Sequence, residues 1–149
     1  ASLNGLEDRL EVVELAVSNH NGIVGFDTGD GMDSSHVVPN PPAGFRGAMV
    51  RGTRIDDWLA GSGRRLGRGD LLKIDAEGAD LDVLKGAEKT LREDAPQVAV
   101  TTYHVDDHAE RIHDWLRAVQ PGYRMRLKGF SFWTSRPRPV LLQASMLDG

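Results

Sequence analysis

The feature that most constrains the fold of this chain is a short apolar segment that runs into two carboxylates and a glycine, DLLKIDAEG at positions 70–78. Leu71, Leu72 and Ile74 lie between glycines at 69 and 78, a pattern typical of a strand buried on both faces of a parallel sheet. The next stretch, from 79 to 94, aligns apolar side chains along one side of a helix: Leu81, Leu84, Ala87 and Leu91. A strand-turn-helix unit, and with it an α/β fold, is therefore predicted.

Acidic side chains stand at the carboxyl end of this predicted strand. In open α/β sheets ligands bind beyond the carboxyl ends of the strands, so Asp75 and Glu77 lie where chemistry is usually done. A second predicted strand, 97–103, is rich in valine and threonine and is followed by His104. Parallel pairing would bring the three side chains together in a cluster suited to removing a hydroxyl proton. A histidine at a strand end can equally be a hydrogen-bonding or capping group.

The central segment and its continuation resemble a known family signature. Positions 72–80 read LKIDAEGAD and positions 84–87 read LKGA. Together they resemble the KIDVEGAE and LKGA motifs of the FkbM family of S-adenosylmethionine-dependent methyltransferases. Ala76 stands where the family usually has valine, and Asp80 where it usually has glutamate. Further matches follow in the same order at positions 13–18, 21–22, 54–59, 102–107, 121–123 and 140–144.

The resemblance implies a Rossmann-like methyltransferase sheet with helices on both faces. It also implies an enzyme that methylates a hydroxyl of a small molecule, of sugar or natural-product type, with S-adenosylmethionine as cofactor. In such an enzyme Asp75, Glu77 and His104 are the expected catalytic residues. Lys73 would support the two acids, or would serve only as a structural ion-pair partner.

Further site residues follow from the same resemblance. Ala16 and Val17, with Asp75, are expected to contact the cofactor, although a buried strand end explains the first two equally well. Ser34, Ser35 and Tyr103 are expected to contact the acceptor. For the two serines, a solvated loop is the simpler explanation.

A glycine-rich cofactor turn between a strand and a helix is not found in this sequence. The glycines within 61–67 precede a predicted strand, and those at 29–31 are soon followed by prolines, which exclude a helix. We therefore expect residues 1–149 to be a single domain, the carboxyl-terminal portion of a class I methyltransferase domain lacking its first strands. The alternative is a truncated, non-catalytic relative that acts as a binding or partner-dependent module.

The front of the chain predicts strands with short connections. Residues 10–17 form a strand, and Asn21-Gly22 is a hairpin signal that folds residues 23–26 back beside it. The prolines and glycines of 27–47 predict a loop, and 48–53 a further strand. Asp56 and Asp57 open a short helix, where acidic side chains favour the helix dipole.

The back of the chain predicts a helix and a closing strand pair. The helix carries an apolar stripe made of Ile112, Trp115, Leu116 and Val119, with His108 and His113 at the surface. Residues 123–127 and 140–144 form an antiparallel pair. The aromatic side chains between them cover the sheet edge or stack on an acceptor: Phe130, Phe132 and Trp133.

Composition narrows the classes of partner. The formal net charge of −4 with interspersed signs argues against a nucleic-acid surface, and the arginines at 64, 65 and 68 fit a solvated loop. No apolar run reaches the length of a membrane span, and no signal peptide opens the chain. With no cysteines, disulfides are excluded. These observations predict a cytoplasmic enzyme with a small-molecule partner and allow a homo-oligomer.

The sequence spacing does not predict a metal site. His104, Asp107 and His108 offer ligand atoms, but no four-ligand spacing is present and the carboxylates have simpler uses. We therefore expect no metal. A metal-assisted hydrolase that uses the same acids is the weaker alternative.

Overall fold

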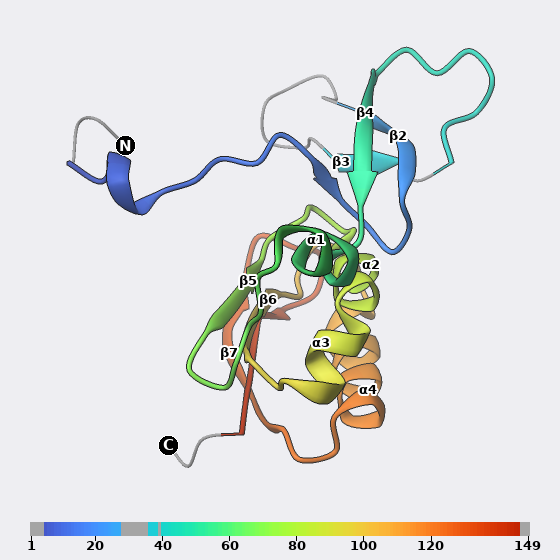
Figure 1. Cartoon of the computed structure of the whole chain (residues 1–149). Coiled ribbons are helices and arrows are strands. Elements are labelled where there is room, and N and C mark those ends of the chain that lie inside the picture. The colour runs from blue at the N-terminus through green and yellow to red at the C-terminus, as the bar shows by residue number, and fades with distance from the viewer. Residues whose placement is uncertain (1–4, 28–35, 39, 147–149) are drawn as a thin grey trace.

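The computed structural model describes residues 5–27, 36–38 and 40–146, and these form two four-stranded sheets with helices (Figure 1). The elements in chain order are the 3-10 helix η2 (Glu7–Arg9), β1 (Ala16–Val17), β2 (Gly22–Asp27), β3 (His36–Val38), β4 (Ala48–Thr53), α1 (Ile55–Ser62), β5 (Leu71–Ile74), α2 (Asp80–Gly86), α3 (Glu88–Glu93), β6 (Gln97–Thr101), α4 (His108–Val119), β7 (Arg124–Ser131) and β8 (Arg138–Ser145). Ser34 and Ser35 lie outside the described residues.

The larger part of the fold is a sheet of order β5-β6-β8-β7, here called sheet B. β5 and β6 are parallel, with Ile74 opposite Val100, while β8 runs antiparallel to both β6 and β7. The predicted strand-turn-helix unit and the antiparallel closing pair are both confirmed. Since β5 and β6 are parallel neighbours, their carboxyl ends open onto one edge of the sheet.

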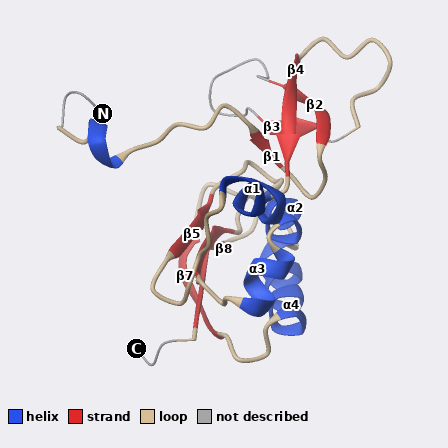
Figure 2. Cartoon of the chain, viewed as in Figure 1, coloured by secondary structure: helices blue, strands red, loops and turns tan. Residues whose placement is uncertain are grey.

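Helices α2, α3 and α4 pack together against sheet B (Figure 2). The core between them contains the fully buried Leu84, Leu91, Ile112, Leu116 and Leu142. On the opposite face the row of Lys73, Ala99, Gln143 and Arg126 carries exposed charged side chains at its two ends. The α/β, Rossmann-like class is thus confirmed, and in the described part of the chain these helices lie along one face of the sheet.

β5 is less buried than predicted. Only Ile74 is buried, at 3% exposure, whereas Leu71 is 60% exposed. In the described ranges β5 pairs only with β6, and helices cover only one of its faces. The expectation of a strand buried on both faces is therefore wrong for β5, although its direction and boundaries are as predicted.

The single helix predicted over 79–94 is two helices, α2 and α3, separated at Ala87. The four apolar residues predicted to face the core are all buried. The start of α3 is capped from outside: Asp56 of α1 accepts hydrogen bonds from the backbone N–H groups of Lys89 at 3.0 Å and Thr90 at 2.9 Å. Asp56 of α1 thus stabilises the start of α3, because its carboxylate satisfies N–H groups that lack helical partners.

The smaller sheet, here called sheet A, has the order β1-β4-β2-β3. The predicted hairpin between the first two strands is wrong, because β4 lies between them, parallel to β1 and antiparallel to β2. Asn21 explains the difference: its side chain accepts from the Arg54 backbone N–H at 3.0 Å and donates to Asp57 at 2.8 Å. The turn is therefore tied to the end of β4. Also, only residues 16 and 17 of the predicted strand 10–17 pair in a sheet.

Sheet A meets the helices at Gly86. A Cβ atom placed on Gly86 would lie 2.2 Å from the carbonyl oxygen of Ser18, so only glycine allows this approach. Nearby, the Asn19 side chain donates to Asp82 of α2 at 3.1 Å. This contact joins the segment after β1 to the helix that follows β5.

The β7–β8 hairpin projects its aromatic residues into solvent. Phe130, Phe132 and Trp133 are all exposed, so they do not cover the sheet edge. No helix in the described ranges is long and apolar enough to cross a membrane.

Candidate active site

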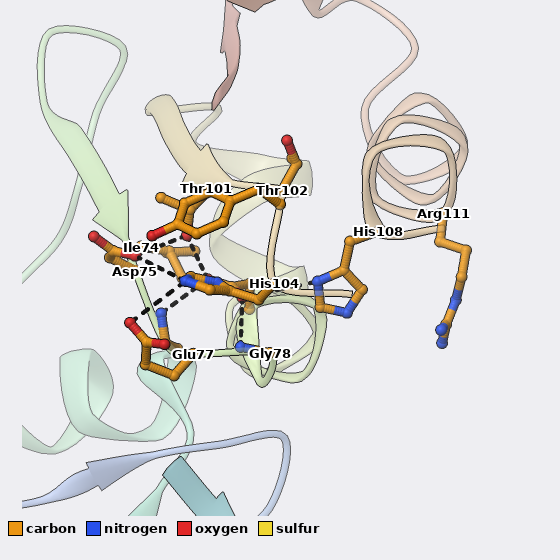
Figure 3. A network of polar contacts seen from close by, with 12 residues as sticks. Ile74, Asp75, Glu77, Gly78, Thr101, Thr102, His104, His108 and Arg111 are labelled. Carbon is orange, nitrogen blue, oxygen red and sulfur yellow. Dashed lines mark hydrogen bonds and ion pairs between the residues drawn. The ribbon is translucent and has the colours of Figure 1, made fainter. Parts of the chain in front are cut away.

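The ends of β5 and β6 bring together Asp75, Glu77 and His104, here called the acid–histidine trio (Figure 3). His104 Nε2 lies 3.4 Å from Glu77 Oε1 and 3.9 Å from Asp75 Oδ1. Glu77 has a left-handed backbone, with φ of 48°, and Gly78 follows with φ of 99°. This turn directs the Glu77 side chain back toward His104 as the chain enters α2. The predicted juxtaposition is therefore present, while the catalytic role of the three residues stays a prediction.

Asp80, the first residue of α2, contacts both the turn that carries Glu77 and the ring of His104. Its carboxylate is fully buried and accepts from the backbone N–H groups of Ala76 at 2.8 Å and Gly78 at 3.1 Å. It also accepts from the Thr101 hydroxyl at 2.9 Å and lies 3.4 Å from His104 Nδ1. A buried carboxylate requires such partners, because an unpaired charge is expensive in the protein interior. Asp80 therefore fixes both the turn and the imidazole ring.

The contact with Asp80 sets the proton position on His104. A carboxylate is an acceptor, so Nδ1 carries the proton in the neutral ring and Nε2 presents its lone pair. The His104 side chain is only 9% exposed, and Nε2 has no hydrogen-bond partner among the described residues. Nε2 is aimed at two further acceptors, the carboxylates of Glu77 and Asp75. With the ring neutral and its proton on Nδ1, the trio is a cluster of acceptors without a shared donor, whereas a protonated ring would donate from Nε2.

Two neighbouring side chains, Lys73 and Thr101, offset only part of the negative charge of this cluster. Lys73 Nζ lies 3.4 Å from Asp75 Oδ2, on the outer side of that carboxylate, and its side chain is about half exposed. Thr101 has a single hydroxyl proton, yet its Oγ1 lies 3.0 Å from Asp75 and 2.9 Å from Asp80. One proton cannot serve both carboxylates at once. The site therefore has an excess of negative charge and of lone pairs.

Tyr103 forms one wall of the site. Its ring centroid is 4.1 Å from that of His104, and Trp133 meets it edge-on at 5.7 Å. Burial raises the pKa of Tyr103, and the negative charges of Asp75, Glu77 and Asp80 raise it further, which keeps the hydroxyl neutral. Arg138 donates to the Tyr103 carbonyl oxygen at 2.9 Å and pairs with Asp106. β8 thereby fixes the loop that carries Tyr103 and His104.

His108 is buried, which corrects the prediction of a surface position. Its side chain is 4% exposed, and Nδ1 lies 3.8 Å from Asp80 Oδ2. Burial lowers the pKa of His108, and the negative charge of Asp80 opposes that shift. The first turn of α4 faces the buried carboxylate, so the helix begins against the site instead of in solvent.

Of the other predicted site residues that the structure describes, Tyr103 lies against His104, and the remaining two belong to the other sheet. Ala16 and Val17 lie on β1 of sheet A, and Val17 lines an apolar hollow of about 330 Å³ beside Leu72 and Ile55. Asp80, Thr101 and His108 were not predicted as site residues. The position of Asp80 in the motif was the one signal that sequence offered for them.

A larger groove, about 920 Å³, lies between the start of α4 and the β7–β8 hairpin. Its lining includes Asp106, Glu110, Asp114 and Arg138. Through Arg138 the groove adjoins the backbone of Tyr103, which connects it to the wall of the site.

Comparison with known proteins agrees with this architecture. The family model described as the methyltransferase FkbM domain matches residues 4–125. The 2-O-methyltransferase NoeI of Sinorhizobium fredii is 33% identical over 99 residues, which span 56% of this chain and 40% of that protein. The crystal structure of methyltransferase FkbM from Methylobacillus flagellatus KT is similar in fold, with a TM-score of 0.59 and 17% identity over 96% of this chain and 30% of that chain.

The chain thus spans less than half the length of either protein. The family match nevertheless extends over most of its residues, including both strands that carry the acid–histidine trio. This chain belongs to the methyltransferase FkbM domain family.

Proposed function

We propose that this chain carries the acceptor side of an S-adenosylmethionine-dependent O-methyltransferase that acts on a hydroxyl of a small molecule. Family membership supports methyl transfer, and the name of NoeI, a 2-O-methyltransferase, supports a hydroxyl as the acceptor. A sugar-like or natural-product hydroxyl is the acceptor class that we propose. Cytoplasmic location belongs to the same proposal.

One observation carries the proposal: the buried, unpartnered Nε2 of His104, aimed at two carboxylates. An alcohol oxygen becomes a competent nucleophile as its proton is removed, and an imidazole lone pair is the usual acceptor of that proton near neutral pH. Glu77 and Asp75 would then stabilise the imidazolium ion. Asp80 would hold the ring through Nδ1, and so orient Nε2 toward the acceptor.

The charge of the site fits the proposed methyl donor. S-adenosylmethionine supplies a methyl group on a positively charged sulfur. Among the described residues, Lys73 is the one lysine or arginine that pairs with the exposed carboxylates of Asp75 and Glu77. An excess of negative charge favours a cationic ligand. Asp75, together with Ala16 and Val17, remains our proposal for the residues that contact the cofactor. For the acceptor we propose Ser34, Ser35 and Tyr103, with the aromatic wall of Tyr103 and Trp133 as a stacking surface.

The test is a methyl-transfer assay with labelled S-adenosylmethionine and a panel of sugar and polyketide alcohols. His104→Gln and Asp75→Asn should each lower turnover by about 100-fold or more, the range usual for loss of acid–base catalysis. His113→Gln alters a histidine on the outer part of α4 and should turn over like the parent. Circular dichroism establishes that each variant is folded. Parental turnover in both site variants would place the reaction elsewhere.

A further inference from the structure

The acceptor atoms of the acid–histidine trio converge, and in the part of the chain that the structure describes the one lysine or arginine paired with the trio, Lys73, contacts it elsewhere. His104 Nε2 lies 3.4 Å from Glu77 Oε1 and 3.9 Å from Asp75 Oδ1, and one ligand atom from each of the three residues lies within 4.8 Å of the others. Neither carboxylate brings a proton, and Asp80 holds the proton of His104 on the opposite nitrogen. Lys73 reaches only the outer oxygen of Asp75. A cation is the species that such a convergence of lone pairs binds.

We propose that Asp75, Glu77 and His104 bind a divalent cation, with Mn²⁺ or Mg²⁺ as the ion class. Neighbouring ligands in an octahedral site with bonds of about 2.1 Å are about 3 Å apart, and opposite ligands about 4.2 Å apart. The separations of 3.4 Å and 3.9 Å from His104 Nε2 fall between these limits. Small side-chain shifts therefore suffice to bring all three atoms to one ion.

The surroundings of His104 are those of a metal-ligating histidine. Such a histidine almost always donates its other N–H to a carboxylate or carbonyl, which fixes the tautomer and the ring orientation. Asp80 is in that position, buried and held by two backbone N–H groups and Thr101. The side chain of His104 is more than nine-tenths buried, so the ring is oriented before any ion arrives.

The ligand set also indicates the kind of ion. Two of the three ligands are carboxylates, which suit Mn²⁺ and Mg²⁺, and the chain has no cysteine to supply the thiolates that softer metals prefer. Asp75 and Glu77 are 51% and 38% exposed, so their side of the ion would stay open to water or to an acceptor oxygen. An open coordination position is typical of a catalytic ion.

This set of metal ligands differs from the set considered on the basis of sequence spacing. Of His104, Asp107 and His108, only His104 belongs to the trio; Asp107 is exposed and pairs with Arg111, while His108 faces Asp80. The ligands come from the ends of two strands that are paired in the sheet, a relation that spacing along the chain does not show.

The role of the ion in the reaction rests on the proposed function; its binding does not. With the ion bound, Nε2 of His104 would be a ligand and could not also act as the base, so the ion would take over activation of the hydroxyl. It would bind the acceptor oxygen, lower the pKa of the hydroxyl and release the hydroxyl proton to water.

The experiment is a titration of chelator-treated, dialysed protein with MnCl₂, followed by electron paramagnetic resonance of free and bound Mn²⁺, with neither donor nor acceptor present. One Mn²⁺ per chain is expected, displaced by excess Mg²⁺. Glu77→Gln and His104→Gln should each weaken binding at least about tenfold. Glu88→Gln, which alters an exposed acid of α3, should bind like the parent. Pulsed measurements should detect a directly bound imidazole nitrogen in the parent and not in His104→Gln.

Absence of bound Mn²⁺ at millimolar concentration would overturn the proposal, as would parental affinity in His104→Gln or no nitrogen signal in the parent. Glu77 is partly exposed and Glu77→Gln keeps its shape, so this variant tests the site even where His104→Gln is destabilised. Because no methyl donor is used, failure of methyl transfer leaves the binding result unchanged, and the two proposals can fail separately.

Discussion

The buried carboxylate of Asp80 contacts both the turn after β5 and the ring of His104. This carboxylate accepts hydrogen bonds from two backbone N–H groups of the turn after β5 and from the Thr101 hydroxyl. It also orients the ring of His104 through Nδ1. Loss of a buried acceptor with several donors leaves those donors unsatisfied, at a cost of about 1–3 kcal/mol for each. A substitution at Asp80 is therefore expected to disturb the trio, although Asp80 is not one of its three residues.

The buried His108 predicts a dependence of stability on pH. Burial lowers its pKa in the folded protein below the ordinary value of 6.5, against the pull of Asp80 and Asp107 and with the help of Arg111 and His104. The unfolded chain then binds more protons below about pH 6.5, so stability is complete above this pH and falls as the pH decreases toward the folded pKa. The loss from this one group is at most about 1.4 kcal/mol per pH unit.

Urea denaturation at pH 7.5, 6.5 and 5.5 measures this effect. His108→Gln should show a smaller decrease in the free energy of unfolding between pH 7.5 and 5.5 than the parent, whatever its stability at neutral pH. His113→Gln retains His108 and should keep the part of the slope that His108 causes. An unchanged slope in His108→Gln would contradict the assignment.

At the scale of residues, sequence predicts which side chains meet when strand ends carry them. Asp75, Glu77 and His104 follow two strands whose parallel pairing could be inferred, so their meeting could be inferred as well. The burial of His108 could not, because it depends on how α4 is rotated against Asp80. The backbone of Glu77, at positive φ, also has no sequence signal, since glycine is the residue that usually marks such a turn.

At the scale of elements, the contact between α2 and the end of β1 makes Gly86 a position where size is critical. In Gly86→Ala the added carbon would lie 2.2 Å from Ser18 O, which is backbone and cannot rotate away. The helix and the strand end must separate, so we expect a loss of about 1–3 kcal/mol in the free energy of unfolding.

Gly61→Ala is the matched control, since Gly61 also lies in a helix and nothing is within 4 Å of its added carbon. There the better helix propensity of alanine should stabilise the protein by up to about 1 kcal/mol. Thermal and urea denaturation of the two variants compares them directly. Equal effects would mean that α2 and Ser18 are not in close contact.

Elements are predicted well where one local pattern decides them. The apolar stripe of α4 and the valine- and threonine-rich run of β6 place those elements within a few residues. The break between α2 and α3 depends instead on Asp56, a residue more than thirty positions away that caps α3. The strand order of sheet A likewise depends on the hydrogen bond between Asn21 and the backbone of Arg54, just after β4. A hairpin signal of two residues carries no information about that distant contact.

At the scale of the whole molecule, the two sheets differ in how much apolar surface they bury. The main core contains residues of β5, β6, β8 and the helices, and among the described residues of sheet A the core cluster includes Val17 alone, packed at its margin. Ile23 and Met49 of sheet A are more than half exposed. Regions with little buried apolar contact open at low free energy. We therefore expect backbone amides of β2 and β4 to exchange with deuterium at least about tenfold faster than those of β6 and β8.

Native-state hydrogen exchange followed by mass spectrometry tests this difference. Peptides that cover 22–27 and 48–53 are compared with peptides that cover 97–101 and 138–145. Equal protection would show that the two sheets open together as one cooperative unit, in spite of their unequal burial.

The edge contact between Trp133 and Tyr103 links an exposed indole to the ring that lies against His104. A ligand that displaces or orders Tyr103 on entering the site is expected to change the emission of Trp133 as well. Comparison with Trp133→Phe subtracts the signal of the two other tryptophans. The molecule therefore contains a fluorescent reporter of site occupancy, which allows ligands to be screened without labels and before any substrate is known.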